Sequence, residues 1–321
     1  MTSPINVWYL DDGTIGGDLN TVLTDFEMII EEAKTIGLEV NISKCELSLG
    51  ETCPYQEIDR NDVKILQKHE LFLLGSALNL ESTQQLVTKK IQDMERILTK
   101  LSILPSHYAL HALRNCYSAP KIIYLLRTTP CLQDNVLNCL DSLIEKATSE
   151  FGNLNFTKSA LDQASLPCRF GGLGIRKASD LAVPAFLSSM VAAEGLIKNL
   201  NPLAHRSSQF EEGLQSWRHT TLMEWPLEPA KQRSWDEALM QIKVKNLLND
   251  ATDVYNQKRL QSLQNKNAGD WLNAVPSRNL GTFLNDDEIR PVLCVRLGLP
   301  YVHERLCKCG MITDSLGKHC F

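Results

Sequence analysis

Two adjacent aspartates near the N-terminus, Asp11 and Asp12, are the residues best suited to carry chemistry. They stand between the β-prone residues 5–10 and Gly13, and an Asp-Asp-Gly sequence in this position predicts the turn of a β-hairpin. Neighbouring carboxylates repel each other unless a cation offsets their charge. Their oxygens suit Mg²⁺, which takes phosphate oxygens as further ligands, and a pair of such ions promotes phosphoryl transfer. A solvent-exposed turn of ordinary composition is the alternative interpretation.

A second group of metal-binding residue types closes the chain. Cys307, Cys309, His319 and Cys320 fall within fourteen residues, and all are of the types that bind Zn²⁺. The Cys-x-Cys spacing is tighter than in most zinc knuckles, and the adjacent His319 and Cys320 would find it difficult to bind one ion together. Two interpretations stay open: a zinc site, or a disordered tail of reduced thiols.

The composition is typical of globular proteins. The 321 residues are 43% hydrophobic and 22% charged, which excludes wholesale disorder, and the length is enough for two or three packed units. No apolar run approaches the roughly 18 residues of a membrane span, so we expect no membrane partner. The first residues do not resemble a secretory signal. Ten cysteines without such a signal predict an intracellular location, nuclear or cytoplasmic.

The charge is distributed unevenly along the chain. Residues 1–62 contain thirteen Asp/Glu and three Lys/Arg, a net −10, so the remaining residues carry +5 of the total of −5. Residues 89–127 contain seven Lys/Arg and two acids, and Lys89, Arg96 and Lys100 share one face of an expected helix, interrupted by Asp93. An acidic head with a basic body suits a metal site next to a polyanion-binding surface. The alternative interpretation of this charge distribution is that the charged residues lie on solvated helix faces and bind no partner.

The sequence pattern predicts an α+β fold that is predominantly helical. Residues 1–78 should form the hairpin, a helix capped by Asp18, and short strands at 38–40, 45–49 and 71–75, the last one buried. We expect helices through 79–150 and 151–290, and a Cys/His segment over 291–321. The glycines at 171, 172 and 174 lack the context of a dinucleotide fold and predict a turn.

Three motifs occur in an order that resembles a known family. Tyr-x-Asp-Asp at residues 9–12 is followed by Gly-Leu-Glu-Val-Asn-Ile-Ser-Lys at 37–44 and by Phe-Leu-Leu-Gly at 72–75. This order is similar to the palm of reverse transcriptases from non-LTR (LINE-like) retroelements. Residues 80–127 resemble the thumb of that family. Segments at 166–189, 269–272 and 296–299, with the closing Cys/His cluster, resemble its C-terminal part.

The resemblance implies an RNA-directed DNA polymerase that uses Mg²⁺, an RNA template and a DNA primer. Asp11 and Asp12 would bind the metal ions, Tyr9 would support the turn near the primer end, and Lys44 would offset charge on the leaving pyrophosphate. The alternative interpretation is that Lys44 is an ordinary exposed lysine on the surface. The resemblance also implies a primer- and backbone-binding set: Phe72, Leu73, Gly75, Lys89, Arg96 and Lys100. Zinc would be bound by the terminal set of Cys307, Cys309, His319 and Cys320, although the family usually places its last cysteine further beyond the histidine.

One departure from the family affects the expected activity. The palm of this family takes a further carboxylate from an upstream strand, and none of the eight residues before Tyr9 is Asp or Glu. Loss of a metal ligand should remove most of the rate enhancement, so we expect the chain alone to be an inactive polymerase fragment. A non-enzymatic helical nucleic-acid-binding module with a zinc cluster is the main alternative, and a poorly folding remnant is another. The sequence leaves the oligomeric state open.

Overall fold

The computed structural model describes residues 1–50, 62–131, 135–202 and 204–317. The chain divides into two compact units, Met1–Leu71 and Phe72–Phe321. Helices dominate the described residues, and the strands among them form only short pairs, which confirms the predicted α+β, predominantly helical class.

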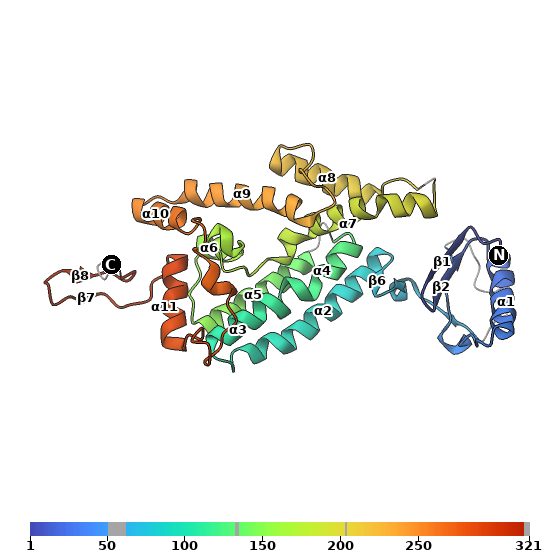
Figure 1. Cartoon of the computed structure of the whole chain (residues 1–321), viewed down its shortest axis with the longest axis horizontal. Helices are drawn as coiled ribbons and strands as arrows, with labels where there is room; N and C mark the ends of the chain where they lie inside the picture. The colour runs from blue at the N-terminus through green and yellow to red at the C-terminus, as the bar shows by residue number, and fades with distance from the viewer. Residues whose placement is uncertain (51–61, 132–134, 203, 318–321) are drawn as a thin grey trace. The chain divides into compact units, whose positions relative to one another are not determined.

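The first unit contains the expected hairpin and helix (Figure 1). Strands β1 (Ile5–Tyr9) and β2 (Asp12–Gly16) pair antiparallel, with Tyr9 opposite Asp12. Helix α1 (Leu19–Thr35) begins after Asp18, whose carboxylate accepts hydrogen bonds from the backbone N–H groups of Asn20 and Thr21. This cap satisfies N–H groups that have no partner within the helix, so the predicted N-cap is confirmed.

A buried carboxylate ties the start of the chain to α1. Asp25 is 3% exposed, and its Oδ2 accepts hydrogen bonds from the backbone N–H groups of Thr2 (2.8 Å) and Ser3 (2.6 Å). The N-terminal segment therefore crosses the helix before entering β1. Asp25 is a structural residue, since its carboxylate is occupied by the backbone.

The short strands differ in part from the expectation. Residues 38–40 form no strand, and β3 (Glu46–Leu47) pairs in parallel with β4 (Lys64–Ile65). The prediction of a buried strand at 71–75 is wrong. Instead, β5 (Phe72–Leu73) forms a hairpin with β6 (Ser76–Ala77). Phe72 and Leu73 are 36% and 37% exposed. The apolar run misled the prediction because Leu74 and Gly75 both have positive φ, 49° and 77°, which makes a two-residue turn inside it.

The second unit begins with that hairpin and continues as helices. These are α2 (Leu80–Leu101), α3 (Ser106–Ala112), a π-helical turn (Leu113–Tyr117), α4 (Ala119–Thr128), α5 (Asn135–Gly152), α6 (Lys158–Ala164), α7 (Ala178–Leu200), α8 (Ser208–Thr221), α9 (Gln232–Asp250), α10 (Val254–Ser262) and α11 (Asp286–Leu297). A last hairpin joins β7 (Arg305–Leu306) to β8 (Ile312–Thr313).

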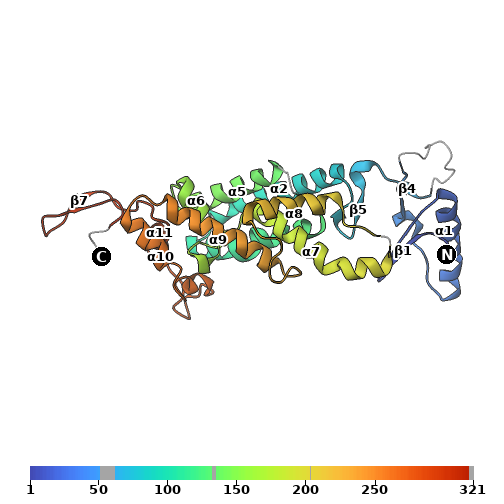
Figure 2. The same ribbon diagram turned by 90° about the horizontal axis from the view of Figure 1, so that it is seen from above.

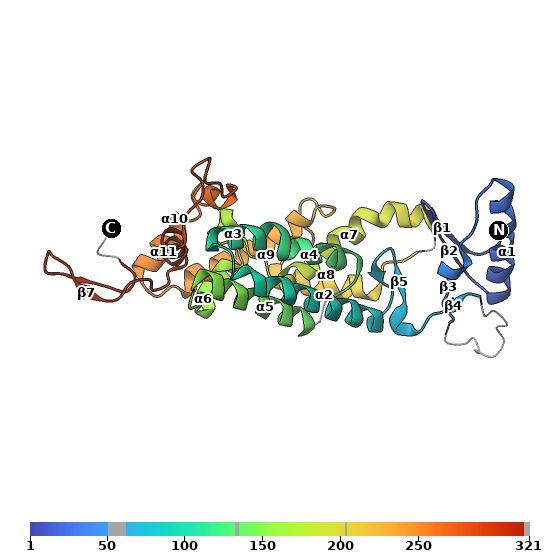
Figure 3. The ribbon, with the colours of Figure 1, turned by 90° about the horizontal axis from the view of Figure 1, so that it is seen from below.

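One hydrophobic core runs through much of the second unit, from Val87 of α2 to Leu299 after α11. Helix α2 packs against α5, and α4 packs against α7 (Figure 3). Helices α8 and α9 lie alongside α7 (Figure 2), and the indoles of Trp217 and Trp235 are buried edge to face at this contact. Burial of these aromatic side chains stabilises the contact.

The glycine-rich segment is a packed turn, as predicted. Gly171 and Gly174 have positive φ of 85° and 76°. At Gly172 an added Cβ would lie 2.0 Å from the carbonyl oxygen of Leu166, so no larger residue fits. The buried Arg296 of α11 donates hydrogen bonds to the carbonyls of Gly172 (3.1 Å), Ala268 (3.0 Å) and Cys168 (3.0 Å). These contacts join three segments that are far apart in the sequence.

Among the described residues, α7 is the one helix long and apolar enough to span a membrane by length and composition. Asp180 and Glu194 interrupt its apolar run, which agrees with the expectation that no uninterrupted run reaches the length of a membrane span. The first half of α7 places Leu181, Ala185 and Leu187 in the core, where their apolar character is used. No membrane is implied by this helix.

Candidate functional site

The tip of the first hairpin is a two-residue turn made by Leu10 and Asp11. Leu10 has φ of 55°, while Asp11 is not among the residues with positive φ, which is the pattern of a type II′ turn. Glycine is the usual residue at the first position, and a side chain there costs about 1–3 kcal/mol. Leu10 is 84% exposed, so packing does not explain its presence. Strain retained on an exposed tip marks this turn as a candidate functional site.

The hairpin orients the residues next to the tip. Residues opposite each other in an antiparallel pair share a face of the sheet. Asp12 therefore lies on the same face as Tyr9, together with Val7 and its opposite residue Thr14. On the other face the indole of Trp8 covers Gly13, where an added Cβ would lie 2.6 Å from the ring. A side chain at position 13 would therefore displace the indole of Trp8 from this face.

Asp11 and Asp12 are exposed, and neither forms an ion pair within the described part of the chain. Two adjacent carboxylates without a basic partner fit the hard oxygen ligands of Mg²⁺. No third carboxylate joins them: Asp18 caps α1, Asp25 binds backbone N–H groups, and the described residues contain no group of three or more His, Cys, Asp or Glu arranged for a metal. The pair therefore fits part of a metal site.

Lys44 lies at the end of a 3₁₀ turn (Ile42–Lys44) and is exposed. No hydrogen bond or ion pair connects its ammonium group to Asp11 or Asp12, although all three belong to the first unit. The structure therefore assigns Lys44 no contact with the acidic turn.

The residues expected at the primer end form an exposed apolar hairpin in the second unit. The Tyr124 hydroxyl of α4 donates a 2.6 Å hydrogen bond to the Leu74 carbonyl, and the hydroxyls of Ser76 and Thr129 lie 3.1 Å apart. These contacts hold the β5–β6 hairpin on α4, and Phe72 and Leu73, which point to opposite faces of the strand, are each about one third exposed. An apolar patch of this kind suits a ligand or partner surface.

Helix α2 presents the expected basic face. Lys89, Arg96 and Lys100 are all exposed, and none of them has an ion-pair partner in the residues that the structure describes. At 100° per residue they lie within about 40° of one another and extend over about 16 Å. The opposite face carries the buried residues Val87, Met94, Leu98 and Leu101. The predicted amphipathic pattern is confirmed.

Arg114 is not part of this face, although it contributes to the basic count of 89–127. Its guanidinium donates to the Leu272 carbonyl, to Asn273 Oδ1 (3.0 Å) and to Cys168 Sγ (3.0 Å). A side chain held by three internal acceptors cannot bind phosphate, so the local composition overstates the basic surface.

The terminal cysteines lie in the loop of the last hairpin. The backbone N–H of Cys307 donates to Met311 O (2.7 Å), and the N–H of Gly310 donates to Cys307 O (2.9 Å). This turn places Cys307 and Cys309 near each other, with Cys309 exposed. His319 and Cys320 lie outside the described residues, so the zinc prediction stays a prediction.

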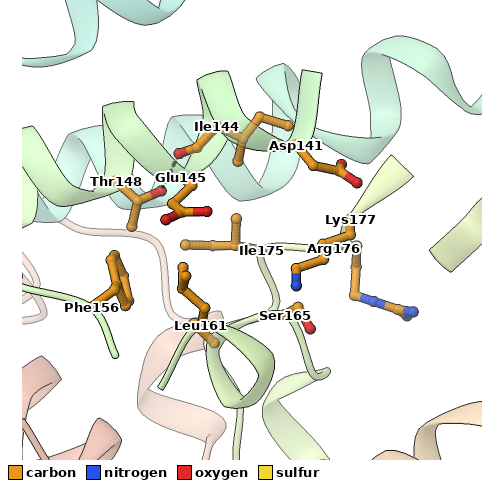
Figure 4. A pocket seen from close by; sticks show the side chains of 11 residues that line it. Asp141, Ile144, Glu145, Thr148, Phe156, Leu161, Ser165, Ile175, Arg176 and Lys177 are labelled. Atoms are coloured by element: carbon orange, nitrogen blue, oxygen red, sulfur yellow. Dashed lines mark hydrogen bonds between the residues drawn. The ribbon is translucent and has the colours of Figure 1, made fainter. Parts of the chain in front are cut away.

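A small pocket between α5 and α6, which the sequence did not indicate, gathers several charged residues (Figure 4). Asp141 accepts hydrogen bonds from the backbone N–H groups of Ala178 (2.6 Å) and Ser179 (3.2 Å) and so caps α7, and burial raises the pKa of its carboxyl. Lys177 and Arg176 are paired with Asp162 and Asp236 respectively. The pocket has a structural role, since these charged groups are occupied.

Comparisons of the chain with protein-family models, with curated proteins and with solved structures found no match.

Proposed function

We propose that this chain is part of an RNA-directed DNA polymerase of the non-LTR retroelement type, and that the first hairpin is its metal-binding turn. The observation that carries the proposal is the Tyr-x-Asp-Asp sequence on a strained two-residue turn, with both carboxylates exposed and without a basic partner. Asp11 and Asp12 would hold Mg²⁺, which supplies charge stabilisation for nucleotidyl transfer when bound.

The chain's own residues would position the nucleic acids. The turn holds the carboxylates beside Tyr9. The partly exposed Phe72 and Leu73 of the β5–β6 hairpin would contact the primer, and α2 would offer Lys89, Arg96 and Lys100 to a phosphate backbone. Cys307 and Cys309, with His319 and Cys320, would bind Zn²⁺. We further propose that catalysis needs a third carboxylate from outside the described residues, because Asp18 and Asp25 are occupied.

The metal-binding turn is tested by Mn²⁺ titration followed by electron paramagnetic resonance. The chain should bind the ion weakly, and the double variant Asp11→Asn with Asp12→Asn should lose at least tenfold in affinity. Asp62→Asn, an exposed acid of the same unit, is the matched control and should leave binding unchanged. Equal binding by the double variant would reject the metal-binding turn. Robust primer extension by the purified chain, abolished by Asp11→Ala, would reject the need for a further carboxylate.

A second candidate function, a nucleic-acid-binding module without catalysis, is favoured by the unpaired basic face of α2. Each phosphate contact contributes about 0.7–0.9 to the slope of log K against log salt. Replacing Lys89, Arg96 and Lys100 by Ala should therefore lower the magnitude of that slope by about two for single-stranded RNA.

The matched control for the basic face is Lys231→Ala, at the residue before α9, combined with Arg233→Ala in its first turn; both side chains are exposed but form ion pairs. This control should leave the salt slope unchanged. Binding that survives the loss of Asp11 and Asp12 supports the module, whereas binding that requires Mg²⁺ and both aspartates supports the polymerase fragment.

A further inference from the structure

The outer edge of β1 carries backbone groups without a partner. A two-residue turn closes with a hydrogen bond between Tyr9 and Asp12, so the pairs of Val7 with Thr14 and Ile5 with Gly16 are also hydrogen-bonded. The N–H and C=O groups of Asn6 and Trp8 therefore point away from β2. No backbone hydrogen bond to either residue occurs in the described part of the chain.

Within the described residues of the first unit, this edge lacks the features that normally prevent pairing with another strand. Such features are charged side chains, proline, bulges and a covering element. Ile5–Tyr9 contains no charged residue and no proline, and its four apolar and aromatic residues are between 40% and 60% exposed. The edge of β2 is a poorer template, because Asp12–Gly16 contains an aspartate and two glycines.

The edge of β1 is complementary to itself. In an antiparallel pair of two β1 strands centred on Val7, Asn6 lies opposite Trp8 of the partner subunit, and Trp8 lies opposite Asn6 of the partner subunit. These are the positions with outward backbone groups, so the register forms hydrogen-bonded pairs on both sides of a two-fold axis. Ile5 then lies opposite Tyr9 of the partner subunit, an aliphatic–aromatic pair that stabilises sheets.

The charge distribution favours this antiparallel arrangement. The first unit contains fourteen Asp/Glu and five Lys/Arg in residues 1–71, a net −9, so two copies repel each other wherever their acidic parts meet. Antiparallel pairing sends the two Asp11–Asp12 tips to opposite ends of the sheet, about 20 Å apart at 3.4 Å per residue. That distance exceeds the Debye length of about 8 Å in physiological salt, so the tips are screened from each other.

We propose that this protein forms a two-fold dimer through the edges of β1, in a four-stranded antiparallel sheet in the order β2, β1, β1 of the partner subunit, β2 of the partner subunit. The occupant of the edge is a second copy of this chain. The inference is independent of the polymerase proposal, because it rests on strand register, exposure and charge alone.

Sedimentation equilibrium of the full chain tests the dimer. The wild-type chain should show a reversible equilibrium between 36.1 kDa and twice that mass. Asn6→Pro removes an outward N–H without disturbing the intramolecular ladder, and it should weaken the dimer at least tenfold. Val7→Lys places two like charges opposite each other on the axis and should do the same. Thr14→Lys, on the same face but one strand away from the axis, is the matched control and should change the dissociation constant of the dimer less than threefold.

A cross-link provides a second test of the register. At the axis the two residues at position 7 form a non-hydrogen-bonded pair with Cα atoms about 4.5 Å apart, which a disulfide can span. Val7→Cys should therefore give a disulfide-linked dimer on a non-reducing gel, in excess of the wild-type chain and of Thr14→Cys. The proposal is overturned if the wild-type chain stays monomeric at 100 μM. It is also overturned if association continues past the dimer without saturating, or if Asn6→Pro, Val7→Lys and Thr14→Lys behave alike.

Discussion

Replacement of Arg296 by Met should destabilise the second unit more than any exposed substitution. The side chain is 4% exposed and donates hydrogen bonds to the carbonyls of Gly172, Ala268 and Cys168. Met fills a similar length of the core but leaves these three acceptors without their donor.

The magnitude follows from two opposing contributions. A hydrogen bond from a charged donor contributes about 1.5–3 kcal/mol, so three of them contribute about 4–9 kcal/mol. Burial of a guanidinium without a carboxylate partner costs several kcal/mol, and Met removes that cost. Burial also lowers the pKa of Arg296, which indicates the same penalty on the charged form. We expect Arg296→Met to lower the free energy of unfolding by about 3 kcal/mol.

Urea unfolding monitored by tryptophan fluorescence measures this loss, because Trp217 and Trp235 are buried in the second unit. Arg296→Lys supplies a single ammonium group instead of the guanidinium fork. It should lower the free energy of unfolding by about half as much as Arg296→Met. Arg233→Met is the matched control: this exposed side chain on α9 pairs with Glu237 and should change stability by less than about 0.5 kcal/mol. A loss below 1 kcal/mol for Arg296→Met would refute the argument that these contacts join the three segments.

Three further predictions concern packing, pH and capping. Gly172→Ala should lower the melting temperature by more than 5 °C in a thermal scan, because its Cβ would meet the Leu166 carbonyl at 2.0 Å; an unchanged melting temperature would contradict the packing. Burial lowers the pKa of His107, whose Nδ1 accepts a hydrogen bond from the Leu284 N–H (3.0 Å). The neutral His107 therefore stabilises the fold fully above pH 6.5, and this contribution is lost as the pH falls through the lower folded-state pKa. His107→Asn should flatten the decline in the urea unfolding free energy below pH 6.5. An equally steep decline in the variant would contradict this role of His107. Asp141→Ala should cost about 1–2 kcal/mol in urea unfolding through loss of the α7 cap, and a neutral result would show that the cap is dispensable.

Local features of this fold were predictable from the sequence. The hairpin at residues 5–16 follows from a β-prone run that meets Asp-Asp-Gly, and the start of α1 follows from the side chain of Asp18. The apolar and basic faces of α2 follow from their spacing. In each case the decisive interactions connect residues at most a few positions apart, so one stretch of sequence contains the whole explanation.

Features that depend on distant partners were not predictable. The run at Phe72–Leu73 has the composition of a buried strand, but its exposure depends on where α4 places Tyr124. Arg114 contributes to a basic count, yet its acceptors at Cys168 and Asn273 come from elsewhere in the chain and withdraw it from the surface.

By itself, the sequence determined the α+β, largely helical class, the acidic hairpin tip and the amphipathic α2, because turn preference, capping and periodicity act over short distances. The tertiary structure alone decided which charged residues remain available for a ligand. Asp25 and Arg296 are occupied by backbone groups, and Arg114 by one backbone and two side-chain acceptors, all brought to them by folding, while Asp11, Asp12 and Lys89 stay exposed. The physical reason is that a buried polar group must find a partner, and the position of that partner is a property of the folded chain.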